Sequence, residues 1–355
     1  MAHPWLSVIM PTCNGGRYLR QAFDSIVAQG PQSTEIEVIV VDDGSSDGTL
    51  AIAADYQRLV RLTIERRAHC GNWVANTNHG IRLARGRYIS ILHQDDMWSP
   101  ARLRALKRLT ARHPGAGIYV HPCWYASSAG RRIGYWHCPF AKRDVPLGPS
   151  EVLPRLLVQC CYGIPAPMFD AAAARAVGLM DESLWFSADW DFWLKLSRTA
   201  TTIYCATPLA MFRLHSASQT VTRARSTDEI HQQQLAVLER HRSALGTAIE
   251  PAVWRVARFS ANMNAALLRL LDGRPNDVSG FACEFCTLGP RGWSRYFRDS
   301  RIVERCLRRL QAGAVGWRAH ADSRLMARAL ARAARPWRHS CTAILDDRIP
   351  VVPVR

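Results

Sequence analysis

The sequence has no hydrophobic run long enough to cross a membrane. A transmembrane helix needs about 18 to 20 consecutive apolar residues, and no apolar run in these 355 residues approaches that length. The first ten residues, MAHPWLSVIM, also lack the basic start and long apolar core of a secretory signal peptide. We therefore expect a cytoplasmic protein, and any contact with a membrane would be peripheral, on its inner face.

Cysteine occurs without the arrangement of a disulfide framework. The eleven cysteines are odd in number and irregularly spaced, which favours a reducing compartment. Cys283 and Cys286 form a lone CxxC pair. A zinc site needs a second ligand pair at a familiar spacing, so we interpret these two as neighbours on one helix face.

The glycine fingerprint of dinucleotide-binding enzymes is also missing. Such enzymes carry GxGxxG after the first strand, so that the backbone can approach a pyrophosphate. Here the corresponding segment reads MPTCNGGRYL, with two adjacent glycines. An NAD-linked dehydrogenase is therefore only a distant alternative.

Positive charge is present in excess and is unevenly distributed. The formal net charge is +17, and the segment Arg291–Arg355 contains fifteen arginines, no lysine and five acidic residues. A net charge of this size favours an anionic partner such as nucleic acid, a membrane surface or a phosphorylated substrate. More than half of the excess lies in the last fifth of the chain.

Residues 1–225 alternate between strand and helix patterns. Apolar, β-branched runs predict strands and helical spacing predicts helices, with Asp47 as the cap of the second helix. This order implies an α/β fold with a mostly parallel sheet and right-handed crossovers. Segment 116–136 predicts a strand pair around the turn 127–130. The predicted strands are 5–11, 35–45, 60–66 and 86–96, and the helices are 16–29, 47–59 and 74–84.

Residues 226–355 predict a basic, helical C-terminal region. An arginine stripe of helical spacing runs through its end, formed by Arg324, Arg328, Arg332 and Arg335. With aromatic residues nearby, the stripe suits an interfacial helix on anionic lipid. A solvated helical face is the alternative. Nucleic acid is an unlikely partner, because no helix-turn-helix, zinc finger or RNA-binding pattern accompanies the charge.

Two acidic pairs follow predicted strands. Asp95 and Asp96 follow the apolar run RYISIL, and Asp42 and Asp43 follow EVIVV. Ligands bind at strand ends in α/β sheets, and paired carboxylates there can hold a divalent metal. The alternative is that these acids only cap helices and form turns, where Asp is a common residue.

Five segments in order resemble family 2 inverting glycosyltransferases, which have the GT-A fold. The resemblance covers residues 5–222 and implies a GT-A type, mostly parallel sheet flanked by helices. Residues 1–225 would then form a nucleotide-sugar-binding catalytic domain. The segments are SVIMPTCNGGRYLRQAFDSIVAQ, EVIVVDDGSSDGT, GRYISILHQDDMWSPARL, GLMDESLWFSADWDFWLKL and FRLHSASQT.

The resemblance assigns nucleotide-sugar binding to one set of residues. Cys13 stands where the family often has Tyr, which implies weaker stacking on the base. Asp42 and Asp43 would contact the base or ribose, while the Arg213-x-His215 loop would lie over the diphosphate. The set comprises Pro11, Thr12, Asn14, Asp42, Asp43, Asn78, Asp95 and Arg213.

The resemblance also implies a metal site and a catalytic base. Asp95, Asp96 and His215 would hold Mg2+ or Mn2+, which stabilises the leaving diphosphate. His93 replaces the first Asp of the usual Asp-x-Asp-Asp pattern.

Asp189 would be the base that takes the proton of the acceptor hydroxyl. Its apolar surroundings would raise its pKa, while Asp191, two residues further on a helix, should point elsewhere. Ala188 replaces a Glu common in the family. The alternative is that Asp189 only stabilises a helix N-terminus.

We therefore expect a metal-dependent hexosyltransferase. It would move a sugar from a nucleoside-diphosphate-sugar, with a UDP-sugar favoured, to a hydroxyl of a glycan or lipid-linked glycan in polysaccharide biosynthesis. The alternative is a non-catalytic basic protein that binds membrane or nucleic acid on a decayed transferase scaffold. His93 and Ala188 are the residues that favour this alternative.

Overall fold

A computed structural model describes residues 3–30, 35–215, 217–219, 227–271 and 278–306. The chain divides into two compact units, residues 1–301 and residues 302–355. Of the second unit, residues 302–306 are described, and they are helical. The arginine stripe from Arg324 to Arg335 therefore lies outside the described residues.

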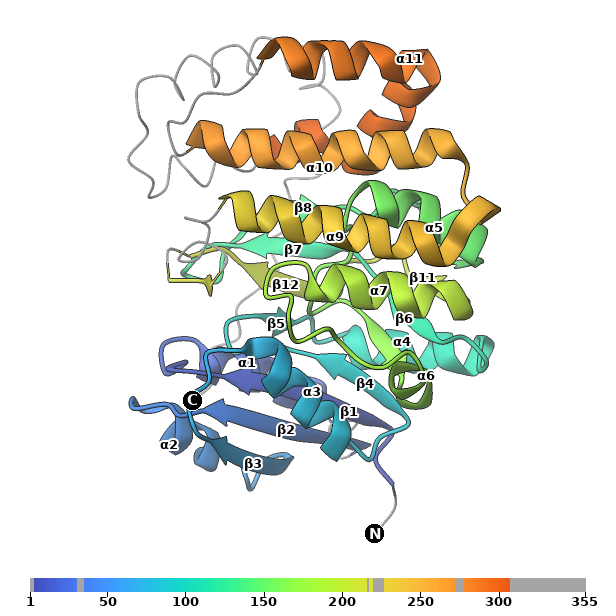
Figure 1. Cartoon of the computed structure of the whole chain (residues 1–355). Coiled ribbons are helices and arrows are strands. Elements are labelled where there is room, and N and C mark those ends of the chain that lie inside the picture. Colours follow the sequence, from blue (N-terminus) through green and yellow to red (C-terminus); the bar gives the residue numbers. More distant parts are fainter. Residues whose placement is uncertain (1–2, 31–34, 216, 220–226, 272–277, 307–355) are drawn as a thin grey trace. The chain divides into compact units, whose positions relative to one another are not determined.

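The first unit contains a large mixed sheet of eight strands (Figure 1). Neighbouring strands β3, β2, β1 and β4 are parallel, whereas β10 runs antiparallel between β4 and β6. The predicted α/β fold is confirmed. The strands in spatial order are β3 (Arg61–Arg67), β2 (Ile36–Asp43), β1 (Leu6–Thr12), β4 (Tyr88–Ile91), β10 (Met168–Asp170), β6 (Ile118–Val120), β11 (Thr202–Tyr204) and β9 (Val145–Leu147).

The adjacent strands β1 and β2 are buried along their whole length. Continuous apolar runs are typical of parallel strands covered by helices on both faces. Both strands end in polar residues, and Thr12 of β1 lies opposite Asp42 of β2. The sheet therefore brings the polar ends of adjacent strands side by side.

The helices between these strands begin and end close to the predicted positions. They are α1 (Leu19–Val27), α2 (Thr49–Asp55) and α3 (Trp73–Leu83). Helix α2 begins after Gly48, so Asp47 is not at the capping position that we predicted. Its carboxylate instead accepts hydrogen bonds from the backbone N–H groups of Thr49 and Gly16, both at 3.0 Å.

A second sheet of four strands contains β5 (Met97–Trp98), β12 (Ala210–Arg213), β7 (Cys123–Ala126) and β8 (Arg132–Trp136). Strands β7 and β8 form the predicted antiparallel pair. Strand β12 pairs with β5, which directly follows Asp95 and Asp96. This pairing brings the Arg213-x-His215 segment back to the acidic pair.

Helices dominate the chain beyond residue 145. Helix α9 packs on α7, and α10 packs on α9, α5 and α11 (Figure 1). None of the helices in the described residues has the length and hydropathy to cross a membrane. The bounds are α4 (Arg102–Arg112), α5 (Pro149–Val158), α6 (Ala171–Ala176), α7 (Ala188–Thr199), α9 (Thr227–Leu245), η2 (Gly246–Ala248), α10 (Pro251–Leu271) and α11 (Val278–Ser300).

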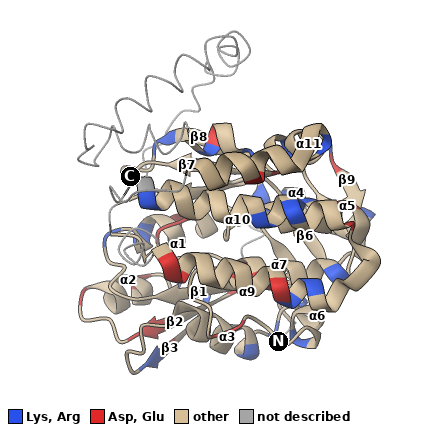
Figure 2. Cartoon of the chain, turned by 45° about the horizontal axis from the view of Figure 1, so that its top comes forward, with Lys and Arg blue, Asp and Glu red and all other residues tan. Residues whose placement is uncertain are grey.

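Basic residues of the first unit are not confined to one element. Figure 2 shows Lys and Arg on α10 and α11 as well as on β3. The arginine-rich C-terminal stretch is largely outside the described residues.

Candidate active site

The polar residues predicted at the strand ends lie at one edge of the large sheet. Pro11 and Thr12 lie opposite Val41 and Asp42 in the parallel register of β1 and β2. On the other side of β1, the backbone N–H of Leu92 donates to the carbonyl of Ile9 at 2.9 Å. Residues 11–14, 42–45 and 93–96 therefore meet where open α/β sheets bind ligands.

Gln94 joins two of these segments directly. Its Oε1 accepts a hydrogen bond from the backbone N–H of Cys13 at 2.9 Å, and its Nε2 donates to the carbonyl of Cys13 at 3.1 Å. A Cβ atom on Gly15 would lie 2.2 Å from Gln94 Oε1, so any larger residue at position 15 would displace the Gln94 amide from this clamp. We did not predict Gln94, although it lies inside the HQDD motif.

Asp43 is a fixed carboxylate beside the loop that follows β3. The backbone N–H groups of Cys70 and Gly71 donate to its Oδ1 and Oδ2 at 2.8 and 2.9 Å. Burial acts to raise the pKa of Asp43, but hydrogen bonds such as that from the Cys70 backbone outweigh it and hold the pKa below its ordinary value. The side chain is therefore an ionised acceptor.

Asn14 and Asp42 join the loops after β1 and β2. Asn14 has a left-handed backbone (φ 47°), its N–H donates to Ser45 Oγ at 2.8 Å, and its Oδ1 accepts from the N–H of Ser46 at 2.9 Å. Asp42 is buried and accepts hydrogen bonds from Thr12 Oγ1 at 3.4 Å and Ser45 N–H at 3.1 Å. These contacts fix the loop shapes from which a nucleoside contact would be made.

The acidic pair forms a cluster with His93. Ligand atoms of His93, Asp95 and Asp96 all lie within 4.8 Å of one another. Asp96 Oδ2 and His93 Nε2 are buried without a hydrogen-bond partner among the described residues, an arrangement that is costly in a protein interior. A bound cation would satisfy both atoms, and the carboxylate donors suit Mg2+ or Mn2+.

The electrostatics of this cluster also suit a cation. Burial and the neighbouring Asp95 carboxylate hold the pKa of Asp96 well above its ordinary value. Burial acts to raise the pKa of Asp95 as well, but the hydrogen bond with His215 and the nearby His93 lower it. The cost of a second negative charge beside Asp95 is what a divalent cation would remove.

His215 lies beside the cluster. Its Nε2 is 2.8 Å from Asp95 Oδ2, and its ring lies 4.7 Å from that of Tyr18. This contact orients the Asp95 carboxylate, as outer partners of metal ligands commonly do. Direct ligation by His215 stays a prediction.

Arg213 is almost fully buried, with 1% of its surface exposed, and it holds the acidic loop. Its Nε donates to the carbonyl of Asp95 at 2.7 Å, and its backbone N–H donates to Asp96 Oδ1 at 3.0 Å. Its Nη2 donates to Gln21 Oε1 at 2.6 Å, and the guanidinium lies over the Tyr18 ring. Because these groups occupy the guanidinium, its predicted contact with the diphosphate stays a prediction.

Asn78 connects α3 to the segment that leads into α7. Its Nδ2 donates to the carbonyl of Met180 and to Glu182 Oε1, both at 2.9 Å, and its Oδ1 accepts from Met180 N–H at 3.1 Å. The side chain is buried. The structure thus shows a positioning role for Asn78, and its contact with a nucleotide-sugar stays a prediction.

Asp189 and Asp191 lie in the first turn of α7 in different environments. Asp189 is half-buried, and burial raises its pKa to about 6. Asp191 is fully buried and pairs with His241 Nε2 at 3.0 Å and Lys195 Nζ at 2.7 Å. Burial acts to raise the pKa of Asp191, but the hydrogen bonds from His241 and Lys195 lower it to about 2. Of the two, Asp189 has the pKa of a base.

The segment before Asp189 is held from two sides. On one side, Trp73 Nε1 donates to the carbonyl of Trp185 at 2.8 Å, while the Trp73 ring lies 5.2 Å from His93. On the other side, Gln233 Oε1 of α9 accepts from the backbone N–H groups of Phe186 and Ser187 at 3.0 and 3.4 Å. Trp73 therefore contacts both the acidic cluster and the start of α7.

Sequence comparison places this chain among sugar-transferring enzymes. The profile described as glycosyl transferase family 2 matches residues 7–145. An uncharacterized glycosyltransferase of Rickettsia typhi is 29% identical over 229 residues, covering 64% of this chain and 69% of the relative. An uncharacterized protein of Mycobacterium tuberculosis is 31% identical over 260 residues, covering 70% and 77%. The chain belongs to glycosyltransferase family 2.

Solved structures share the fold. Residues 1–349 of Staphylococcus aureus TarS in complex with UDP-GlcNAc superpose with a TM-score of 0.55 at 18% identity, covering 86% of this chain and 91% of that one. The mannosyltransferase PcManGT of Pyrobaculum calidifontis, in complex with GDP-Man and Mn2+, has a TM-score of 0.50 at 16% identity, covering 84% and 85%. The predicted GT-A type fold is thus confirmed.

Proposed function

We propose that this glycosyltransferase is a metal-dependent, inverting enzyme. It moves a hexose-type sugar from a nucleoside-diphosphate-sugar to a hydroxyl of a glycan or lipid-linked glycan. The observation that carries the proposal is the buried, unpartnered oxygen of Asp96, which lies with His93 and Asp95 beside the strand ends that carry Asp42 and Asp43.

A UDP-sugar is the favoured donor. The complexes of TarS with UDP-GlcNAc and with UDP, and of PcManGT with GDP-Man, support a nucleoside diphosphate in this fold. Asp43 would accept a hydrogen bond from an N–H of the base, because its carboxylate is ionised and fixed by two backbone N–H groups. Pro11, Thr12 and Asn14 would form the adjoining wall.

The residues that would hold Mg2+ or Mn2+ are Asp95, Asp96 and His93. When bound, such an ion supplies positive charge that stabilises the departing diphosphate. His215 keeps the Asp95 carboxylate in place. Arg213 fixes the loop by binding the carbonyl of Asp95 and the carboxylate of Asp96.

Asp189 would act as the general base. As the acceptor oxygen forms its bond to the anomeric carbon, its proton moves to the Asp189 carboxylate. The bond between that carbon and the diphosphate oxygen breaks, and its electron pair leaves with the diphosphate. Attack opposite the leaving group inverts the configuration. A pKa of about 6 keeps most Asp189 deprotonated at neutral pH while retaining basicity.

The non-catalytic alternative is not favoured. The two replacements that support it are His93 and Ala188, yet His93 places an imidazole nitrogen within the acidic cluster. Asp189 keeps a base-like pKa next to a buried Ala188. Metal-dependent release of UDP from a UDP-sugar by the purified protein would exclude this alternative.

The acidic cluster can be tested by measuring nucleotide binding with and without Mn2+. We expect Mn2+ to tighten UDP binding to the wild-type protein at least about tenfold, because the ion joins carboxylates to a diphosphate. Asp96→Asn should lose this effect and keep the weak, metal-free binding. Asp55→Asn is the matched control, because its side chain is 59% exposed and pairs with Arg20. A full Mn2+ effect in Asp96→Asn would refute the site.

We extend the proposal to the arginine-rich C-terminal region. Its charge would bring the enzyme to an anionic membrane surface, where a lipid-linked acceptor is found. The support for this step is the concentration of fifteen arginines between Arg291 and Arg355.

A further inference from the structure

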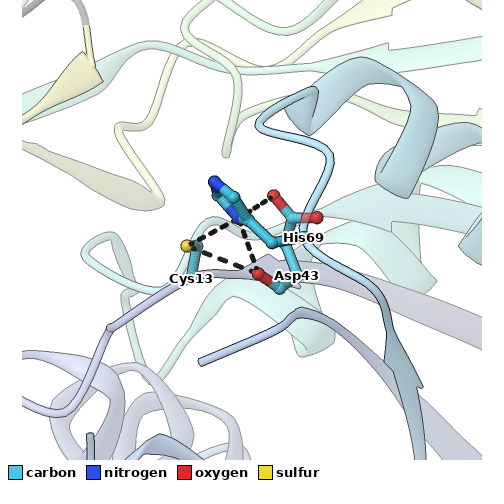
Figure 3. Close-up of side chains that lie close together, drawn as sticks. All are labelled: Cys13, Asp43 and His69. Carbon is cyan, nitrogen blue, oxygen red and sulfur yellow. Dashed lines mark hydrogen bonds and ion pairs between the residues drawn. The ribbon is translucent and has the colours of Figure 1, made fainter. Parts of the chain in front are cut away.

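A thiol, an imidazole and a carboxylate meet at the ends of three neighbouring strands. Cys13 follows β1, Asp43 ends β2, and His69 lies in the loop after β3 (Figure 3). One ligand atom from each lies within 4.8 Å of the other two. Neither the family resemblance nor the acidic cluster accounts for this combination.

Two of the three spacings between ligand atoms are close to those of a tetrahedral zinc site. Typical Zn–S, Zn–N and Zn–O bonds of about 2.3, 2.0 and 2.0 Å place tetrahedral N and O ligands about 3.3 Å apart, and S and N ligands about 3.5 Å apart. The observed separations are 3.2 Å between His69 Nδ1 and Asp43 Oδ2, and 3.9 Å between Cys13 Sγ and His69 Nδ1. Shifts of a few tenths of an ångström in the ligand atoms would bring both separations to the tetrahedral values.

The three residues differ in rigidity in a way that suits metal capture. Asp43 is fixed by backbone N–H groups of Cys70 and Gly71, a constraint typical of the partners that orient metal ligands. His69 has 64% of its side chain exposed and can adjust its ring. Binding would replace the Cys13 thiol proton, which is released to solvent.

The donor atoms also set this cluster apart from the acidic one. A thiolate ligand favours Zn2+ and similar ions, whereas carboxylate-rich sites suit Mg2+ and Mn2+; each cluster also contains one imidazole. The cluster of His93, Asp95 and Asp96 has no sulfur ligand. Two neighbouring sites in one protein would therefore discriminate between two classes of divalent ion.

We propose that Cys13, Asp43 and His69 form a zinc-binding site and that Zn2+ bound there excludes the nucleoside of the donor. The second part rests on the proposed function, in which Asp43 binds the base. Three protein ligands leave one tetrahedral position for water. An ion held by Asp43 occupies the carboxylate that the base would need, so zinc acts as a competitive inhibitor.

The site can be tested with Co2+ in the presence of excess Mg2+. A thiolate ligand gives Co2+ an intense near-ultraviolet charge-transfer band, which the sulfur-free acidic cluster cannot produce. We expect one equivalent of this band in the full-length protein. The band should be lost in Cys13→Ser. His69 is exposed, and the variant His69→Ala should weaken Co2+ binding at least about tenfold.

The CxxC pair supplies the matched control. Cys283 and Cys286 are exposed and could bind Co2+ by themselves. The double variant Cys283→Ser, Cys286→Ser should keep the band. A band that survives Cys13→Ser, or one that disappears in this double variant, overturns the proposed site.

Competition is then measured by UDP titration at increasing Zn2+, again with excess Mg2+. The apparent Kd of UDP should rise more with Zn2+ in the wild-type protein than in Cys13→Ser. Any rise in the variant measures the zinc bound by UDP itself. An unchanged Kd at saturating Zn2+ overturns the competition. If UDP does not bind without Zn2+, the proposed function fails, while the Co2+ band still decides whether the zinc site exists.

Discussion

At the scale of single residues, two carboxylates in one helical turn have opposite surroundings. Asp191 pairs with the cations Lys195 and Arg240 and hydrogen-bonds His241. The main hydrogen bond to Asp189, in contrast, comes from the backbone N–H of Trp190 at 2.7 Å. Asp189 therefore keeps a lone pair available for a proton. Burial alone accounts for its raised pKa.

Asp189→Asn should abolish most sugar transfer. Loss of a general base typically reduces a rate by about 10² to 10⁴, so we expect kcat to fall by that factor while UDP-sugar binding by calorimetry is unchanged. Wild-type turnover in this variant would exclude Asp189 as the base.

The thermal stability of Asp189→Asn can be predicted from the raised pKa of Asp189. The pKa of Asp189 is about 6 in the folded protein and about 3.9 in an unfolded chain. Ionising it therefore costs folding stability increasingly as pH rises from 3.9 to 6, and the full cost remains above that window. Asp189→Asn removes this cost, so its Tm at pH 8 should equal or exceed that of the wild type. A lower Tm would attribute lost activity to misfolding.

The pH dependence of kcat/KM provides a separate prediction. Because the base must be deprotonated, kcat/KM should fall about tenfold per pH unit below about pH 6 and level off above it. Donor binding measured over the same pH range corrects for other titrating groups. A profile that is flat between pH 5 and pH 8 would contradict the assignment.

At the scale of elements, α9 holds the segment that precedes the base. Gln233→Ala removes the acceptor for the N–H groups of Phe186 and Ser187. We expect kcat to fall about tenfold with KM for the donor unchanged, since misplacing a catalytic group slows the chemical step. Gln232→Ala, an exposed neighbour on the same helix, should have wild-type kinetics. Equal kinetics in both variants would show that α9 does not position Asp189.

Much of the sheet could be predicted because its strands have strong local patterns. Strand β2 is a run of buried β-branched residues that ends in Asp42 and Asp43, so its end could be recognised from sequence. Strand β10 has three residues, which is too short for any periodicity. Its antiparallel insertion between β4 and β6 depends on tertiary packing and could not be predicted.

In the candidate active site, the sequence could predict residues whose type and position indicate a chemical role, but not the contacts that those residues make. The pair Asp95 and Asp96 could be found, because ligands bind at strand ends in α/β sheets and adjacent carboxylates there can hold a metal. The contacts of Arg213 could not be predicted, because its partner Gln21 lies 192 positions away in the sequence. The place of His93 in the acidic cluster likewise depends on the shape of the loop.

At the scale of the whole molecule, the arginine-rich end of the chain can be separated from the catalytic unit. A chain ending at Arg301 keeps the first compact unit, so we expect unchanged UDP binding and Tm. It should lose the salt-sensitive binding to anionic lipid vesicles that we expect of the full chain. Neutral vesicles serve as the control. Equal vesicle binding by both chains would show that residues 302–355 are not the membrane contact.

The hydrogen bond between Asp191 and His241 limits how this enzyme can be recombined with its relatives. The two residues are 50 positions apart, on α7 and α9, whereas the profile of the family ends at residue 145. A hybrid that joins residues 1–225 of this chain to the C-terminal helices of another transferase inherits Asp191 without His241. Natural or laboratory hybrids should therefore keep their stability only when the crossover point leaves α7 and α9 from the same parent.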